Sequence, residues 1–171
     1  MIKIRLERPG EVLAIRDVNE KAFGEPLEAD IIDKIRANCI NTLSLVAVNC
    51  DDIVGHILFS PAVIDTEQGV IKGMGLAPMA VLPEYQKQGI GSKLVNEGFK
   101  MLREMLCPFV IVLGHPGYYP RFGFERASDY GLKSQWEEVP QEAFMIKFFD
   151  ETIKPYVSGI GRYRDEFDEA M

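Results

Sequence analysis

The chain has 171 residues, of which 47% are hydrophobic and 26% charged, and its formal net charge is −7. This length fits one compact domain with a single core, so we predict one domain over residues 1–171. The excess of acidic residues opposes binding to the phosphate backbone of nucleic acids. The longest apolar runs, such as 109–113, are far shorter than the roughly 20 residues that span a bilayer, so no membrane span is predicted.

The amino terminus and the cysteines favour a cytoplasmic protein. Residues 1–7 alternate apolar with charged side chains and lack the continuous apolar segment of a secretory signal. Cys39, Cys50 and Cys107 are odd in number and far apart, and the chain has no CxxC pair. We therefore predict buried, reduced thiols and no metal site.

The first third of the chain predicts a strand, two helices and a hairpin. The strand covers about 3–8, and apolar residues then follow at helical spacing up to Phe23. A second helix is expected from about Glu28 to a break at 38–41. The branched runs 43–48 and 53–60 flank an Asn-Cys-Asp-Asp turn, and so they predict a hairpin.

The middle of the chain predicts a long strand, a helix and a buried strand. Glycines and a proline within 71–82 predict an interruption of that strand's ladder near 75–78. Apolar residues along one face from Gly91 predict a helix that ends at 107–108. The apolar run 109–113 is typical of a strand at the centre of a sheet.

The carboxy-terminal part begins with an aromatic loop at 117–124. A polar stretch follows to about Glu142, and 144–149 predicts a last apolar strand. In the tail, 150–171, the sequence Gly-Ile-Gly at 159–161 predicts a turn. The apolar final strand and the tail favour a homodimer.

The sharpest local pattern joins the strand 71–82 to the helix after it. The first amides of a helix have no partner inside the helix and lie at the positive end of its dipole, so they favour a bound pyrophosphate. Gly89 and Gly91 let the backbone bend and approach the phosphate oxygens. Lys87 and Lys93 add positive charge. This junction is therefore a candidate anion site.

Two rival glycine motifs do not match this junction. The P-loop pattern GxxxxGK[ST] fails because Ser92 separates Gly91 from Lys93, and the dinucleotide pattern GxGxxG fails because residue 94 is leucine. A nucleotide-binding regulatory domain is therefore the weakest of the functional hypotheses.

The run 79–95, MAVLPEYQKQGIGSKLV, resembles the central motif of the GNAT superfamily of acyl-coenzyme A-dependent N-acetyltransferases. In that superfamily the pattern Q/R-x-x-G-x-G/A holds the pyrophosphate. The segment YPRFGF at 119–124 resembles the family's later Y-x-x-x-G-F segment. The resemblance covers about 1–127 in element order, and GHPGYY at 114–119 with GRY at 161–163 is similar to a branch of small bacterial N-acetyltransferases.

The resemblance implies a mixed α/β fold with a mostly antiparallel central sheet, helices on both faces, and two parallel strands that splay apart, about 76–82 and 109–114. The core would cover about 1–127, with carboxy-terminal strands and a tail over 128–171. Acetyl-CoA would thread through the gap, with its pyrophosphate on the loop. The implied cofactor-binding residues are Met79, Ala80, Val81, Gln86, Lys87, Gln88, Gly89, Ile90, Gly91, Ser92 and Lys93.

The implied reaction transfers the acetyl group to an amine of a small molecule or peptide. Tyr119 is the expected acid, because a phenol with a pKa near 10 stays protonated at neutral pH and can donate to the departing thiolate. His115 is the expected base, with a suitable intrinsic pKa. Other residues stay open for these two roles: Tyr118, His56, Glu25 and Glu84, or a water molecule.

A second hypothesis is a coenzyme A-binding sensor without turnover, which would keep the loop and lose the acid. No motif identifies the amine acceptor.

Overall fold

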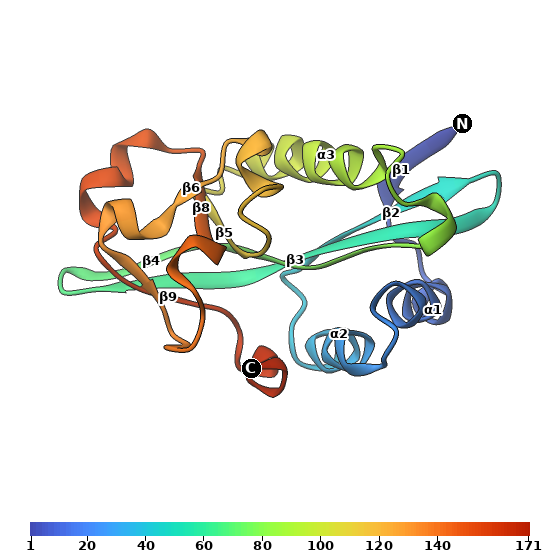
Figure 1. Cartoon of the computed structure of the whole chain (residues 1–171), viewed down its shortest axis with the longest axis horizontal. Helices are drawn as coiled ribbons and strands as arrows, with labels where there is room; N and C mark the ends of the chain where they lie inside the picture. The colour runs from blue at the N-terminus through green and yellow to red at the C-terminus, as the bar shows by residue number, and fades with distance from the viewer. The chain divides into compact units, whose positions relative to one another are not determined.

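The computed structural model describes residues 1–171, with three α-helices and nine strands (Figure 1). Contacts divide the chain into two compact units, each built from segments that are not contiguous in sequence. Unit 1 comprises Met1–Phe59, Pro78–Lys100 and Asp165–Met171, and unit 2 comprises Ser60–Ala77 and Met101–Arg164. The strands β3 (Asp52–Thr66) and β4 (Gly69–Val81) contribute residues to both. A single domain over 1–171 stays a prediction.

Unit 1 contains an antiparallel run of strands. The strand β1 (Ile2–Leu6) pairs with β2 (Leu43–Asn49), and β2 pairs with the first part of β3. The β2–β3 connection is the predicted hairpin, with a register shift between Ala47 and Val48. Alternation along β2 sends Val46 and Val48 to one face of the sheet and Leu45 and Ala47 to the other.

Helices cover both faces of these strands (Figure 1). The helices α1 (Val12–Phe23) and α2 (Leu27–Asn38) lie on one face, where Ile15 packs with Val46 and Val48. The helix α3 (Ile90–Glu104) lies on the other face, which confirms the predicted arrangement.

Glycines let α3 approach the strands of unit 1 closely. A Cβ added at Gly98 would lie 2.4 Å from the ring of Phe59, and one added at Gly55 would lie 3.3 Å from both Ile90 and Leu94. The missing side chains therefore make room for a helix packed directly on β2 and β3. The start of α3 is held in place by this packing.

Unit 2 contains the strands that follow α3. The strand β5 (Phe109–Leu113) pairs in parallel with β4 and antiparallel with β8 (Phe144–Phe148), which also pairs with β6 (Glu125–Arg126). The strand β9 (Gly159–Arg162) runs antiparallel to the end of β3 and parallel to β7 (Leu132–Ser134). Antiparallel pairing dominates in both units, so the predicted fold class is confirmed.

The parallel ladder between β4 and β5 is short. It joins Met74 to Val110 and ends at Leu76 and Val112, although β5 continues to Leu113. The predicted interruption of the ladder near 75–78 is therefore present.

The predicted turn at 159–161 is wrong, because these residues form the strand β9. Gly159 is required by close packing, since a Cβ there would lie 2.1 Å from the carbonyl oxygen of Asp65. A Cβ at Gly161 would lie 2.6 Å from the ring of Phe144. Both glycines therefore serve a close approach between segments and not a change of chain direction.

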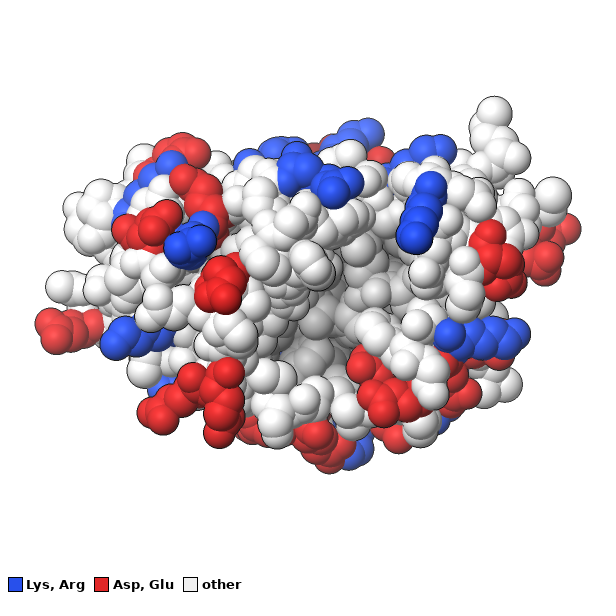
Figure 2. Space-filling model, in the orientation of Figure 1, with Lys and Arg blue, Asp and Glu red and all other residues white.

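The surface carries charges of both signs. On the face drawn in Figure 2, acidic and basic side chains are interspersed in small groups. The prediction of buried thiols is wrong, because Cys50 is exposed and Cys39 and Cys107 are only partly buried. No helix combines the length and the apolar character that crossing a membrane requires.

Candidate active site

The loop between β4 and α3 offers a row of unengaged backbone amides. After the short 3₁₀ helix η1 (Pro83–Tyr85), the first amide bonded to the helix ladder is that of Lys93, which donates to the carbonyl of Gly89 at 3.1 Å. The amides of residues 87–92 donate to no acceptor in the protein. Residues 86–89 are exposed, so an anion can reach these amides. This combination is typical of an anion site at a helix amino terminus.

Side chains of unit 1 hold this loop in place. The side-chain amide of Gln86 donates to the carbonyl of Val81 at 2.9 Å, and that of Gln88 donates to the carbonyl of Glu84 at 3.2 Å. The amide of Asn49 donates to the hydroxyl of Tyr85 at 3.1 Å. Gln86 and Gln88 thus shape the loop with their side chains.

The backbone of the loop turns through two left-handed residues. Lys87 has φ 63° and Gly89 has φ 84°. A Cβ at Gly89 would meet nothing within 4 Å, so glycine is favoured there by the backbone angle and not by space. The loop conformation therefore depends on glycine at this position.

The remaining predicted cofactor residues differ in burial. Met79 and Val81 are partly buried on β4 and Ala80 is buried between them. At the start of α3, Ile90 is buried in the core. The other three residues are reachable to different degrees: Gly91 and Ser92 are partly buried, and Lys93 is exposed.

Tyr119 is fixed in unit 2 by a glycine and by other aromatic rings. It begins the 3₁₀ helix η2 (Tyr119–Phe122), and its ring lies against Gly114, where a Cβ would be only 2.2 Å from Cε2. The rings of Tyr118 and Phe124 meet it edge-on, with centroids 5.1 and 5.6 Å away. Its hydroxyl forms no hydrogen bond within the protein.

Burial has a marked effect on the phenol of Tyr119. It raises the pKa of Tyr119 to about 12, and the neighbouring Tyr118 adds to the rise. The phenol therefore keeps its proton at neutral pH and has a free donor to offer.

His115 lies in the turn before Tyr119 and is exposed. Its Nδ1 accepts a hydrogen bond from the amide of Gly117 at 3.2 Å, and its carbonyl accepts from the amide of Tyr118 at 3.0 Å. Since Nδ1 accepts, the neutral ring carries its proton on Nε2. In this geometry the lone pair on His115 Nδ1, the ring atom that would accept a proton, points toward the amide of Gly117 in the same turn.

Comparison with known proteins agrees with these features. The family model described as "Acetyltransferase (GNAT) domain" matches residues 3–127. The N-acetyltransferase YhbS of Escherichia coli is 31% identical over 96% of this chain and 98% of its own. The N-acetyltransferase YjhQ of the same organism is 42% identical, over 75% of this chain and 72% of its own. The chain belongs to the GNAT family of acetyltransferases.

Solved structures support the assignment at the level of the fold. The crystal structure of YhbS from Escherichia coli in complex with CoA superposes with a TM-score of 0.90 at 31% identity, covering 98% of this chain and 92% of that one. A GNAT acetyltransferase from Brucella melitensis in complex with acetyl-CoA superposes with a TM-score of 0.81 at 35% identity, covering 98% and 99%. This GNAT chain is therefore an acyltransferase.

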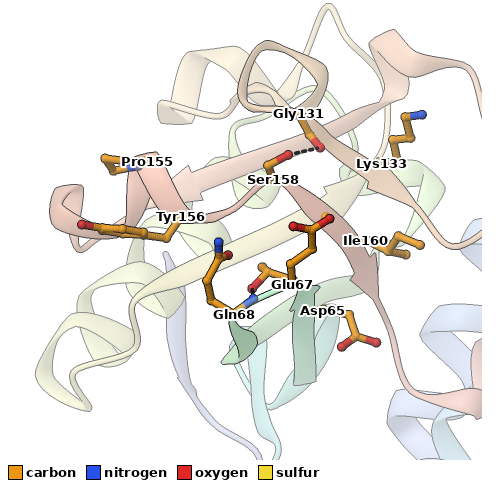
Figure 3. A pocket seen from close by; sticks show the side chains of 11 residues that line it. Asp65, Glu67, Gln68, Gly131, Lys133, Pro155, Tyr156, Ser158 and Ile160 are labelled. Carbon is orange, nitrogen blue, oxygen red and sulfur yellow. Dashed lines mark hydrogen bonds between the residues drawn. The ribbon is translucent and has the colours of Figure 1, made fainter.

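Unit 2 of this GNAT chain also contains an open pocket of about 730 Å³ (Figure 3). It lies beside the β3–β4 turn and the start of β9, and Asp65 at its edge pairs with Arg162 at 3.3 Å. None of the predicted site residues lines it. No local pattern indicates this pocket, because its lining comes from segments far apart in the chain: Asp65, Thr66, Glu67, Gln68, Gly131, Lys133, Pro155, Tyr156, Ser158, Gly159 and Ile160.

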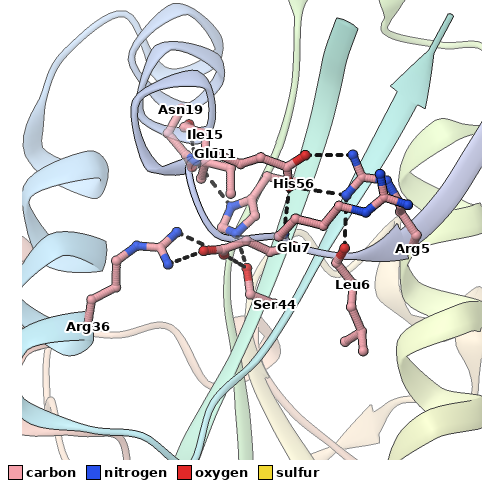
Figure 4. Close-up of polar contacts among 10 residues, drawn as sticks. Arg5, Leu6, Glu7, Glu11, Ile15, Asn19, Arg36, Ser44 and His56 are labelled. Atoms are coloured by element: carbon pink, nitrogen blue, oxygen red, sulfur yellow. Dashed lines mark hydrogen bonds and ion pairs between the residues drawn. The ribbon is translucent and has the colours of Figure 1, made fainter. Parts of the chain in front are cut away.

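The second histidine of the GNAT chain, His56, belongs to a buried polar network in unit 1 (Figure 4). Asn19 Nδ2 donates to the carbonyl of Ile15 at 3.0 Å, and the same nitrogen lies 3.2 Å from His56 Nδ1. A carbonyl can only accept, so this atom is a donor nitrogen and His56 Nδ1 must accept. The proton of the neutral ring therefore sits on Nε2.

The other side of the His56 ring continues the network. His56 Nε2 lies 2.9 Å from the hydroxyl of Ser44, which in turn donates to the carboxylate of Glu7. Glu7 is paired with Arg36. We call Asn19, His56, Ser44, Glu7 and Arg36 the His56 network.

His56 is fully buried, and this decides its protonation state. Burial lowers the pKa of His56 to about 3, and the positive charge of Arg36 adds to the effect. Both ring nitrogens are engaged within unit 1. His56 therefore holds α1 and β2 together through neutral hydrogen bonds. The two carboxyl alternatives for the base, Glu25 and Glu84, are both exposed.

Proposed function

We propose that this GNAT chain is an N-acetyltransferase that moves the acetyl group of acetyl-CoA to an amine on a small molecule or peptide. The observation that carries the proposal is the row of unengaged amides at residues 87–92, which is built to receive a diphosphate. Two similar proteins bind CoA or acetyl-CoA in their crystal structures, which supports the same cosubstrate here.

The proposed binding roles are divided between backbone and side chains. The amides of Gln88, Gly89, Gly91 and Ser92 would bind the pyrophosphate, and Lys87 and Lys93 would add positive charge. The backbone of Met79, Ala80 and Val81 would bind the pantetheine arm and polarise the thioester carbonyl. Gln86 would position the loop through its bond to Val81, while the buried Ile90 anchors the start of α3.

The proposed chemistry is a direct attack of the neutral amine on the thioester carbonyl. The C–N bond forms, the C–S bond breaks, and the thiolate of CoA leaves. Tyr119 donates its proton to that thiolate. The nitrogen of the amine loses its own proton, which returns to the Tyr119 phenolate through water. The overall products are the amide and the free thiol.

The raised pKa of Tyr119 affects both steps of proton transfer. A phenol with a pKa of about 12 is a weaker acid than a free tyrosine. The same apolar surroundings would raise the pKa of a thiolate formed beside it, which keeps the transfer feasible. His115 as the general base stays a prediction, as do a homodimer and a cytoplasmic location.

A matched pair of glycine variants tests the proposed cosubstrate site. Gly89→Ala and Gly10→Ala both place a Cβ at a left-handed residue with no neighbour within 4 Å, so both carry a similar backbone strain. Only Gly89 lies in the loop. By calorimetry we expect Gly89→Ala to weaken coenzyme A binding about tenfold, since roughly 1–2 kcal/mol separates the left-handed conformation from its alternatives. Gly10→Ala should bind like the wild type.

An assay of the wild-type protein then decides between the N-acetyltransferase and the coenzyme A-binding sensor. Release of free thiol from acetyl-CoA is measured against a panel of polyamines, aminoglycosides, amino acids and peptides. Turnover with any of them supports the transferase. Tight binding of coenzyme A without turnover would favour the sensor, and failure to bind coenzyme A would refute both.

A further inference from the structure

Tyr163 is a buried tyrosine that no functional motif explains. It follows β9, and its hydroxyl lies 3.1 Å from the carbonyl oxygen of Leu76 and 3.1 Å from that of Ile111. These two carbonyls belong to β4 and β5, the strands of the short parallel ladder. The ladder ends at Leu76 and Val112, so the hydroxyl stands at the point where the pairing stops.

Three separate contacts hold Tyr163 in this position. Its ring lies over Gly75, where a Cβ would be 2.5 Å from Cε1. The indole of Trp136 stacks on the ring, with centroids 5.8 Å apart and an interplanar angle of 28°. The backbone amide of Tyr163 donates to Gln135 Oε1 at 2.6 Å. The phenol is therefore placed by the fold with little freedom to move.

The hydroxyl of Tyr163 also lies close to the end of β5. Its single proton is shared between the carbonyls of Leu76 and Ile111, and Ile111 lies two residues before Leu113, the last residue of β5. Burial raises the pKa of Tyr163, and the nearby Tyr119 adds to the rise. One hydroxyl satisfies backbone groups on both strands in a buried site, where an unpaired group would be costly.

The end of β5 leads directly to Tyr119. Leu113 is followed by Gly114, whose amide donates to the carbonyl of Ala143 at 2.9 Å and whose open face receives the Tyr119 ring. A shift of this segment would move the surface on which that ring rests. Tyr163 is therefore linked to the ring of Tyr119 through the carbonyl of Ile111 and the end of β5.

We propose that Tyr163 is a positioning residue for acetyl transfer. Its hydroxyl closes the β4–β5 ladder and fixes the segment Leu113–Gly114, and that segment sets the place of Tyr119. The inference rests on the proposed function, because it needs Tyr119 to act as the acid. Tyr163 itself does not exchange a proton with the substrate.

The test compares Tyr163→Phe with Tyr130→Phe in the full chain. Each change removes one phenolic hydroxyl, and in Tyr130 that hydroxyl donates only to Glu125, at 2.7 Å. With the ring kept on Gly75, Tyr163→Phe should lower kcat about tenfold, as expected for the loss of a hydrogen bond, and change KM for acetyl-CoA less than about twofold. Tyr130→Phe should leave both values near those of the wild type.

Two further measurements separate positioning from a general loss of stability. In a Tyr119→Phe background, Tyr163→Phe should lower kcat by less than about twofold, because the two residues act as one unit. Hydrogen exchange at the amide of Gly114, which donates to the carbonyl of Ala143, should be about tenfold faster in Tyr163→Phe than in the wild type, since the end of β5 that the Tyr163 hydroxyl holds would open more often.

The outcomes are decisive in either direction. Unchanged kcat in Tyr163→Phe, or additive effects of the two tyrosine changes, would overturn the positioning role. If the wild type turns over no amine, the proposed function fails. The exchange rate of the Gly114 amide then decides the structural half of the proposal alone, and an unchanged rate would overturn that too.

Discussion

The His56 network in unit 1 and the tyrosine pair of Tyr119 and Tyr163 in unit 2 both consist of buried or partly buried polar residues, yet their hydrogen bonds differ. In the network, both nitrogens of the histidine are bonded to side chains of unit 1. In the tyrosine pair, Tyr163 is bonded to backbone carbonyls while the Tyr119 hydroxyl has no partner in the protein. Burial of a titratable group therefore does not by itself mark chemistry. The residue that we propose as the acid, Tyr119, is the one whose hydroxyl has no partner.

The largest expected effect tests the hydroxyl of Tyr119, which has no hydrogen-bond partner in the protein. Tyr119→Phe keeps the ring on Gly114 and removes the proposed acid, so kcat for thiol release should fall about 100-fold, the usual lower range for general acid catalysis. Stability should change little, because the hydroxyl has no bond to lose. Calorimetric binding of coenzyme A serves as the control and should be retained. A variant with wild-type kcat would remove Tyr119 from the mechanism.

The next effect tests His56, whose two ring nitrogens are both hydrogen-bonded. The pKa of His56 is about 3 in the folded protein and about 6.5 when unfolded, so between these values the unfolded state binds more protons. Stability is therefore complete above pH 6.5 and is lost as the pH falls, at up to about 1.4 kcal/mol for each pH unit. Denaturant titrations from pH 7 to 4 would measure this slope.

The matched variant for that experiment is His56→Gln, which keeps a polar side chain and cannot titrate. Its stability should fall less steeply with acid than that of the wild type, and its kcat at neutral pH should stay within about twofold, as for a residue outside the chemistry. If the His56→Gln variant is fully folded but loses most of its kcat, His56 belongs to the active site, and the contrast drawn with Tyr119 is wrong.

The smallest expected effect concerns the support of the Tyr119 ring. In Gly114→Ala the new Cβ would meet the ring at 2.2 Å, so the ring must move. We expect the unfolding free energy to fall by about 1–3 kcal/mol, the usual range for overpacking, and kcat to fall with it. In a Tyr119→Ala background, Gly114→Ala should cost much less unfolding free energy, because the clashing ring is gone. Equal losses in both backgrounds would mean that the contact is not responsible.

Local chemistry made the loop between β4 and α3 predictable. An amphipathic helix that starts after a glycine-containing turn must present unpaired amides, whatever packs elsewhere. The same local rules placed the three helices and the first hairpin within a few residues of their observed bounds, and the family motif on residues 79–95 identified the fold class. These features depend on neighbours in sequence, so they could be read without the tertiary structure.

Features that depend on a distant partner could not be read in this way. Gly159 and Gly161 indicated a turn, but they belong to the strand β9, which packs closely against Asp65 and Phe144. In the sequence His56 is only a histidine on a predicted hairpin. Its contacts with Asn19 and Ser44 show that both of its ring nitrogens are hydrogen-bonded.

Tyr163 is the clearest case, since the residues whose carbonyls it contacts, Leu76 and Ile111, lie 87 and 52 positions away in the sequence. The sequence alone determined the junction between β4 and α3 and the GNAT architecture, because periodicity, glycine angles and helix ends are local properties. Only the tertiary structure decided which buried polar groups are satisfied and which is free, because a hydrogen bond requires two groups that the chain brings together from far apart.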